Sequence, residues 1–143
     1  MPILEKAITI KAPVDRVFKF VSDPVNLPQI WPSLFEIKGV RTLPNGGHKF
    51  EWLYNMAGQK VEGTVETLEH VPNERIVDKA IGDVESVFTW KFHGENGTTK
   101  VEFLADYKTP MPFLDPKDER FVLKRNEFEA YALLENLKAR FEV

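Results

Sequence analysis

The fold of this chain is decided by residues 84–107, which read VESVFTWKFHGENGTTKVEFLADY. Large apolar side chains alternate with other residues on both sides of the Asn96-Gly97 pair; they are Val84, Phe88, Trp90 and Phe92, then Val101, Phe103 and Tyr107. A period of two places each set on one face of a pleated strand. Asn-Gly between two such strands is a hairpin signal. The stretch therefore predicts an antiparallel hairpin with one aromatic face.

The same alternation predicts further strands upstream of this hairpin. In residues 48–56 the alternating set is Phe50, Trp52, Tyr54 and Met56. The expected strands are 4–11, 35–43, 48–57, 60–71, 75–81, 84–93 and 98–107. Short turns join the last six, so they pair antiparallel, because parallel neighbours need long crossovers. The outward positions are polar, which predicts that one face of the sheet meets water.

Helical spacing flanks the sheet sequences. Val14, Val17, Phe18 and Val21 recur at this spacing and predict a helix that ends near Ser22-Asp23-Pro24. Prolines at 24, 28 and 32 allow only a short second helix or an irregular turn. Asp115-Pro116 precedes a long helix over about 117–141, which at 1.5 Å per residue spans ~37 Å. We expect an α+β fold in which a curved sheet grips this helix, with a pocket between them.

The long helix carries two apolar stripes. The first, expected to cover the pocket, contains Leu123, Ala130, Leu134, Leu137 and Phe141, flanked by Asn126 and Leu133. Asn126 either hydrogen-bonds a ligand or bonds a sheet residue or a water. The second stripe lies nearly opposite and contains Phe121, Phe128, Tyr131 and Ala132. The loops around residues 24–32 and 109–114 are candidates to cover it, and a dimer or partner contact is the alternative.

Composition argues against several classes of function. The chain has 143 residues, 43% hydrophobic and 29% charged, which is typical of a soluble globular protein with one domain over 1–143. A net charge of −3 offers no basic field for nucleic acid, and no cysteine is present for disulfides or thiolate metal sites. No metal or cofactor motif occurs, so we expect neither group. No integral membrane segment or export signal is apparent, and the cytoplasm is the expected location.

Few polar side chains fall on the inward face of the predicted sheet. They are His48, Tyr54, Ser86 and Tyr107, with Thr67 and Arg41 as further candidates. Tyr54, Tyr107 and His48 are the catalytic candidates, since a buried phenol can polarise a carbonyl group. The alternatives are a hydrated strand end for His48 and a structural or ligand-orienting role for the tyrosines. No inward carboxylate pair emerges, because Glu51, Glu62, Glu66, Glu85 and Glu102 fall on the outer face, and this argues against an enzyme.

Three segments carry a family resemblance: Ile10-Lys11-Ala12-Pro13-Val14-Asp15-Arg16-Val17-Phe18, Ser22-Asp23-Pro24 through Ile30-Trp31-Pro32, and Glu69-His70-Val71-Pro72-Asn73-Glu74-Arg75-Ile76. With the order strand, two short helices, six strands and a long helix, the chain resembles the helix-grip fold of the START/SRPBCC superfamily, in its polyketide cyclase/dehydrase-like branch. The resemblance implies a deep apolar cavity between sheet and terminal helix, opened by the loops near residues 24–33, 57–59, 82–84 and 109–114. The superfamily includes carriers, receptors, cyclases and chaperone activators, so fold does not decide function.

Three functions stay open. The first is binding, transport or sequestration of a small hydrophobic or amphipathic ligand, by a monomer or homodimer. The second is a cyclase, aromatase or dehydratase acting on a hydrophobic intermediate. The third is a protein-interaction module that uses the outer stripe of the last helix. The expected ligand-binding residues are Phe50, Trp52, Tyr54, Met56, Ser86, Phe88, Trp90, Phe103, Tyr107, Asn126, Ala130 and Leu134. The competing interpretation of the aromatic residues is that they fill a solid core.

Overall fold

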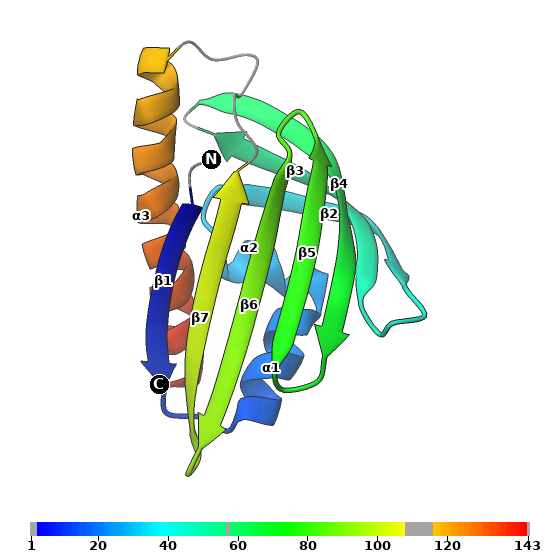
Figure 1. Cartoon of the computed structure of the whole chain (residues 1–143), viewed down its shortest axis with the longest axis vertical. Coiled ribbons are helices and arrows are strands. Elements are labelled where there is room, and N and C mark those ends of the chain that lie inside the picture. The colour runs from blue at the N-terminus through cyan, green and yellow to red at the C-terminus, as the bar shows by residue number, and fades with distance from the viewer. Residues whose placement is uncertain (1–2, 57, 108–115, 143) are drawn as a thin grey trace.

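A computed structural model describes residues 3–56, 58–107 and 116–142 (Figure 1). The elements are β1 (Ile3–Ile10), α1 (Val14–Ser22), η1 (Pro24–Asn26), α2 (Leu27–Ile30), β2 (Leu34–Thr42), β3 (His48–Met56), β4 (Gln59–Val71), β5 (Arg75–Gly82), β6 (Ser86–Glu95), β7 (Thr98–Tyr107) and α3 (Pro116–Phe141). The predicted α+β helix-grip fold is confirmed. The predicted strand 84–93 begins two residues later, at Ser86.

All seven strands form one antiparallel sheet in the order β1-β7-β6-β5-β4-β3-β2. The decisive hairpin pairs Ser86 with Tyr107 and Trp90 with Phe103, which puts the aromatic residues of its two strands on one face. The chain therefore adds each strand beside the previous one and then returns to place β1 next to β7 (Figure 1). Strands β1 and β2 are the two edges of the sheet.

Two glycines stand opposite each other where β4 and β5 pair. Gly63 pairs with Gly82 there, and a Cβ atom on Gly63 would collide with the backbone oxygen of Ile81. Gly82 has a φ of +134° and would itself clash with the Glu62 carbonyl if it carried a side chain. A glycine is thus required at both positions, because backbone approaches backbone directly.

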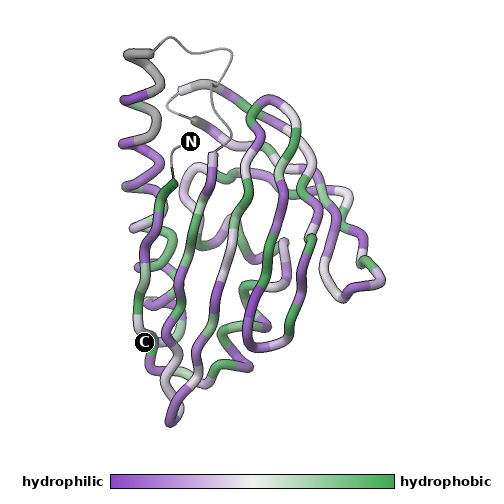
Figure 2. The backbone as a smooth tube through the Cα atoms, viewed as in Figure 1, coloured by the Kyte–Doolittle hydropathy of each residue, from purple (hydrophilic) through white to green (hydrophobic). Residues whose placement is uncertain are grey.

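The helices lie on this inner face of the sheet. Figure 1 shows α3 alongside β1 at one edge, with α1 and α2 behind the middle strands. The α3 helix contacts β1, α2 and β3. Figure 2 shows hydrophobic and hydrophilic residues alternating along the strands, as a sheet with one covered face requires. The most deeply buried large residues, including Trp90, Phe103, Leu133 and Leu137, lie between the sheet and the helices.

The two stripes of α3 have different surroundings. Ala130, Leu133, Leu134 and Leu137 are buried, whereas Phe121, Phe128 and Tyr131 are 60%, 64% and 59% exposed. The expectation that residues 24–32 cover the outer stripe is wrong. The segment is instead tied to the inner side of α3, where Asn136 Nδ2 donates a 2.9 Å hydrogen bond to the backbone oxygen of Ile30. Residues 109–114 and the Leu123 side chain lie outside the described part of the chain.

None of the helices described by the structure combines the length and apolarity needed to cross a bilayer.

Candidate ligand-binding cavity

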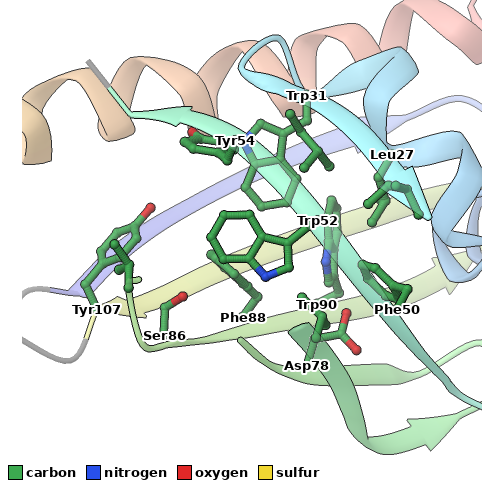
Figure 3. Close-up of a pocket in the computed structure, with 14 residues that line it drawn as sticks. Leu27, Trp31, Phe50, Trp52, Tyr54, Asp78, Ser86, Phe88, Trp90 and Tyr107 are labelled. Atoms are coloured by element: carbon green, nitrogen blue, oxygen red, sulfur yellow. The ribbon is translucent and has the colours of Figure 1, made fainter. Parts of the chain in front are cut away.

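A cavity of about 50 Å³ lies against the inner face of the sheet (Figure 3). Its described lining residues are mostly aromatic and aliphatic, and they are Leu27, Trp31, Leu34, Ile37, Phe50, Trp52, Tyr54, Val65, Asp78, Val84, Ser86, Phe88, Trp90 and Tyr107. They come from α2, from the loop that follows it, and from strands β2 to β7. The strand contribution follows from the predicted alternation, which turns every second side chain inward.

The structure brings most of the predicted strand residues to this cavity. Those that line it are Phe50, Trp52, Tyr54, Ser86, Phe88, Trp90 and Tyr107. Four others are buried in the core without lining it, namely Phe103, Asn126, Ala130 and Leu134. The Met56 side chain lies outside the described residues.

The cover of the cavity differs from the expectation. The α3 helix was expected to be the lid, but among the described residues the covering side chains belong to Leu27, Trp31 and Leu34. The segment that bears them lies between α3 and the sheet. Two hydrogen bonds hold it there: the Asn136 bond to Ile30, and the backbone N–H of Ser33, which donates to Glu129 Oε1 at 2.8 Å. Glu129 and Asn136 thus connect α3 to the segment that covers the cavity.

Trp31 is the central side chain of this cover. Its ring meets Tyr54, Phe88 and Phe103 edge to face, with centroid separations of 6.0, 5.4 and 5.7 Å. Such contacts are favourable for aromatic quadrupoles. Aromatic rings therefore occupy most of the interior, and the free volume is small beside the ~300–1,000 Å³ of typical ligand pockets. The free volume of the interior therefore lies between the two expectations from the sequence, a completely filled core and a deep pocket.

Tyr54 and Tyr107 are buried phenols at one end of the cavity (Figure 3). Burial raises the pKa of both hydroxyl groups, and their proximity to Glu129 raises them further. The Tyr54 hydroxyl lies near Glu129 and near the Trp31 indole N–H, and that N–H has no well-aligned hydrogen-bond partner among the described residues. Both tyrosines are consequently neutral hydrogen-bonding groups and not anions.

Asp78 is a cavity residue that sequence reasoning missed. Its Oδ1 accepts a 2.7 Å hydrogen bond from the Thr67 hydroxyl, and burial raises its pKa to about 6, against the opposing effect of that bond. The signal was present in the strand over 75–81, because Ile76 and Ala80 are inward apolar residues and Asp78 lies between them at the same period.

The remaining polar candidates lie away from the cavity. His48 is half-buried at the start of β3, close to His70, whose pKa is lowered by burial and by His48. Arg41 is exposed. Thr67 is buried and reaches the cavity only through Asp78. Within the described residues, no three His, Cys, Asp or Glu side chains gather as a metal site.

A seven-strand antiparallel sheet curved around a C-terminal helix, with an apolar cavity on its inner face, is a helix-grip fold, which the described residues share with a START superfamily protein. The family model described as polyketide cyclase / dehydrase and lipid transport matches residues 1–142, and the chain belongs to that family. No curated protein sequence matches the chain.

Solved structures agree with this assignment at the level of the fold. A protein of Thermus thermophilus has a TM-score of 0.84 at 22% identity, covering 98% of this chain and 97% of that one. The Zhui aromatase/cyclase of a Streptomyces species has a TM-score of 0.84 at 18% identity, over 99% and 93% of the two chains. A START superfamily protein of Mycobacterium smegmatis has a TM-score of 0.78 at 17% identity, over 98% and 97%. Identities this low show a shared fold alone.

Proposed function

We propose that this protein binds a small hydrophobic or amphipathic molecule in the cavity beneath Trp31, for transport or sequestration. The observation that carries the proposal is the chemistry of the lining, in which aromatic and aliphatic side chains surround a few separated polar groups. Ligand pockets typically have this composition. Membership of a family described by lipid transport as well as by cyclase activity supports the same conclusion.

Binding requires the cavity to enlarge, because about 50 Å³ admits only a few atoms. The cover is the part best suited to move. It is a short helix and loop that two hydrogen bonds connect to α3, one accepted by Ile30 and one donated by Ser33. The aromatic floor of the cavity, in contrast, belongs to strands of the hydrogen-bonded sheet. We expect Trp31 and Leu34 to withdraw together as a ligand enters.

The test is tryptophan fluorescence during titration with fatty acids, isoprenoid quinones, flavonoids and sterols, since all three tryptophans line the cavity. A matched pair of variants locates the site: Ser86→Leu fills the cavity from β6, while Thr89→Leu adds similar bulk on the outer face of the same strand. Saturable quenching by one ligand class, retained in Thr89→Leu and lost in Ser86→Leu, is the expected result. No saturable response from any class would overturn the proposal.

A second candidate is aldol cyclisation and dehydration of a poly-β-ketone. The observation that favours it is the pair of neutral buried phenols, one of them near Glu129, beside an aromatic cavity. A phenol that donates to a ketone oxygen stabilises the negative charge developing there as the new carbon–carbon bond forms. Tyr54→Phe or Tyr107→Phe should then abolish turnover of a model poly-β-ketone and leave its binding nearly intact. Equal loss of binding and turnover would assign these tyrosines to holding the ligand only.

A further inference from the structure

The cavity contains a polar group whose role the fold does not explain. Asp78 places a carboxyl group among Phe50, Trp52 and Trp90, where burying a charge is costly (Figure 3). A partly buried carboxyl with a built hydrogen-bond partner, lining a cavity, is a typical arrangement for recognising a ligand.

Thr67 determines how this carboxyl is oriented. Its Oγ1 accepts a 3.1 Å hydrogen bond from the backbone N–H of His48 and donates the 2.7 Å bond to Asp78 Oδ1. Because His48 already donates to Oγ1, the Thr67 proton is available for Oδ1. The proton of a neutral Asp78 then resides on Oδ2, for which the described residues offer no hydrogen-bond partner. Because Asp78 lines the cavity, Oδ2 is available to donate to a molecule bound there.

A second free donor lines the same cavity. Trp52 is 8% exposed, and its buried indole N–H has no hydrogen-bond partner among the described residues. A buried donor without a partner costs free energy that a ligand oxygen would recover. The strand pairing adds two further hydroxyl groups along the cavity floor, because Ser86 pairs with Tyr107 and lies diagonally from Asp78 across β5 and β6.

The charges of the lining select against one class of ligand. None of the described lining residues is Lys, Arg or His, and the one acidic group is Asp78. A ligand carboxylate would find no cation there and would be repelled once Asp78 ionised. The other titratable lining groups, Tyr54 and Tyr107, are neutral because burial raises their pKa.

We propose that Asp78, oriented by Thr67, forms a polar subsite in the cavity that donates a hydrogen bond to a carbonyl or hydroxyl oxygen of an uncharged aromatic ligand and disfavours carboxylates. The inference rests on the proposed binding function and specifies the ligand class for it. Fatty acids are then poor ligands, and neutral ketones, quinones and phenols are good ones. Asp78 is a positioning and specificity residue for the ligand.

Three single-ring probes of similar size separate these possibilities: ethylbenzene, acetophenone and benzoate. Binding is followed by NMR through the indole N–H signals, first at pH 5 and then at pH 8. At pH 5 we expect acetophenone to bind about tenfold more tightly than ethylbenzene, as one well-placed hydrogen bond allows, and benzoate to bind most weakly. The advantage of acetophenone should shrink at pH 8, where an ionised Asp78 no longer donates.

Two variants assign this preference to Asp78. Asp78→Leu should lose the advantage of acetophenone, so that acetophenone and ethylbenzene bind the variant with similar affinity. Asp78→Asn, whose amide can donate, should retain that advantage and make it independent of pH; it also serves as the test if Asp78→Leu does not fold. Equal affinities for ethylbenzene and acetophenone in the wild type would overturn the subsite while leaving the cavity as a binding site. Absence of binding by all three probes, together with no response in the fluorescence panel, would overturn the proposed function itself.

Discussion

The hydroxyl group of Thr67 donates a 2.7 Å hydrogen bond to Oδ1 of Asp78, directly across the β4–β5 ladder. The two residues are register partners, and the β4 irregularity between Thr67 and Glu69 follows immediately. A bulge re-aims the side chains beside it and is a frequent companion of functional positions. The Thr67–Asp78 pair thus combines an irregular strand with a buried ionisable group, next to the cavity.

The stability of the protein should depend on the ionisation of Asp78. Burial raises its pKa from 3.8 to about 6, so the folded state binds more protons than the unfolded state between these values. The contribution of Asp78 to the free energy of unfolding is therefore fully present below about pH 4, and it is lost as the pH rises through about 6. The upper limit of the effect is about 3 kcal/mol, at 1.36 kcal/mol per pKa unit.

Urea unfolding of the wild type and of Asp78→Asn at pH 4 and pH 8 measures this dependence. Comparing the two proteins at each pH cancels the titration of other groups. We expect the variant to gain stability relative to the wild type between pH 4 and pH 8. A difference that stays constant over this range would mean that the pKa of Asp78 is close to its unfolded value.

The close pairing of β4 with β5 should depend on Gly63. A Cβ atom at this position meets the Ile81 carbonyl, which belongs to the neighbouring strand and cannot rotate away. Gly63→Ala should therefore cost more than about 2 kcal/mol in the free energy of unfolding. Gly58→Ala is the control, because Gly58 has a φ of +89° with open space around it and should cost only about 1 kcal/mol. Similar losses in both variants would show that the strands can separate to accept a methyl group.

Replacing a side chain by alanine should affect stability differently on the two faces of α3. Leu133 is fully buried and Phe128 is 64% exposed on the same helix. Leu133→Ala should destabilise the protein by about 2–5 kcal/mol, whereas Phe128→Ala should change its stability by no more than about 0.5 kcal/mol. Thermal or chemical unfolding compares the two. A large loss in Phe128→Ala would indicate that another surface covers the outer stripe in solution.

The segment that covers the cavity should loosen when its connection to α3 is removed. Asn136→Ala deletes the 2.9 Å hydrogen bond to the Ile30 carbonyl and should cost about 1 kcal/mol. Hydrogen exchange at the backbone amides of Trp31 and Leu34, which bond Leu27 and Trp31, should become faster. Glu135→Ala changes the adjacent exposed residue and should leave this exchange unaltered. Unchanged exchange in Asn136→Ala would show that other contacts, among them the hydrogen bonds of Ser33 with Glu129 and Asn55, are sufficient to hold the cover.

The sequence by itself determined the strands, the antiparallel order and the inward aromatic set. These features follow from local rules: side chains alternate at period two, short turns exclude parallel pairing, and proline and Asn-Gly end elements. Phe50, Trp52, Phe88 and Trp90 could be assigned to one face without any knowledge of their neighbours. The buried stripe of α3 was predictable for the same reason, because apolar residues that recur at helical spacing lie on the face of the helix that is turned away from water.

Only the tertiary structure decided what those faces meet. The cavity is covered by the α2–β2 segment, because hydrogen bonds with Glu129 and Asn136 of α3, far along the chain, hold this segment between α3 and the sheet. The role of Asp78 depends on Thr67, its partner across the β4–β5 ladder. The register of the two strands, which shifts just after Thr67, determines this pairing. The volume of the cavity depends on how aromatic rings from several elements pack together. Such properties arise from contacts between distant residues, and a local pattern carries no information about them.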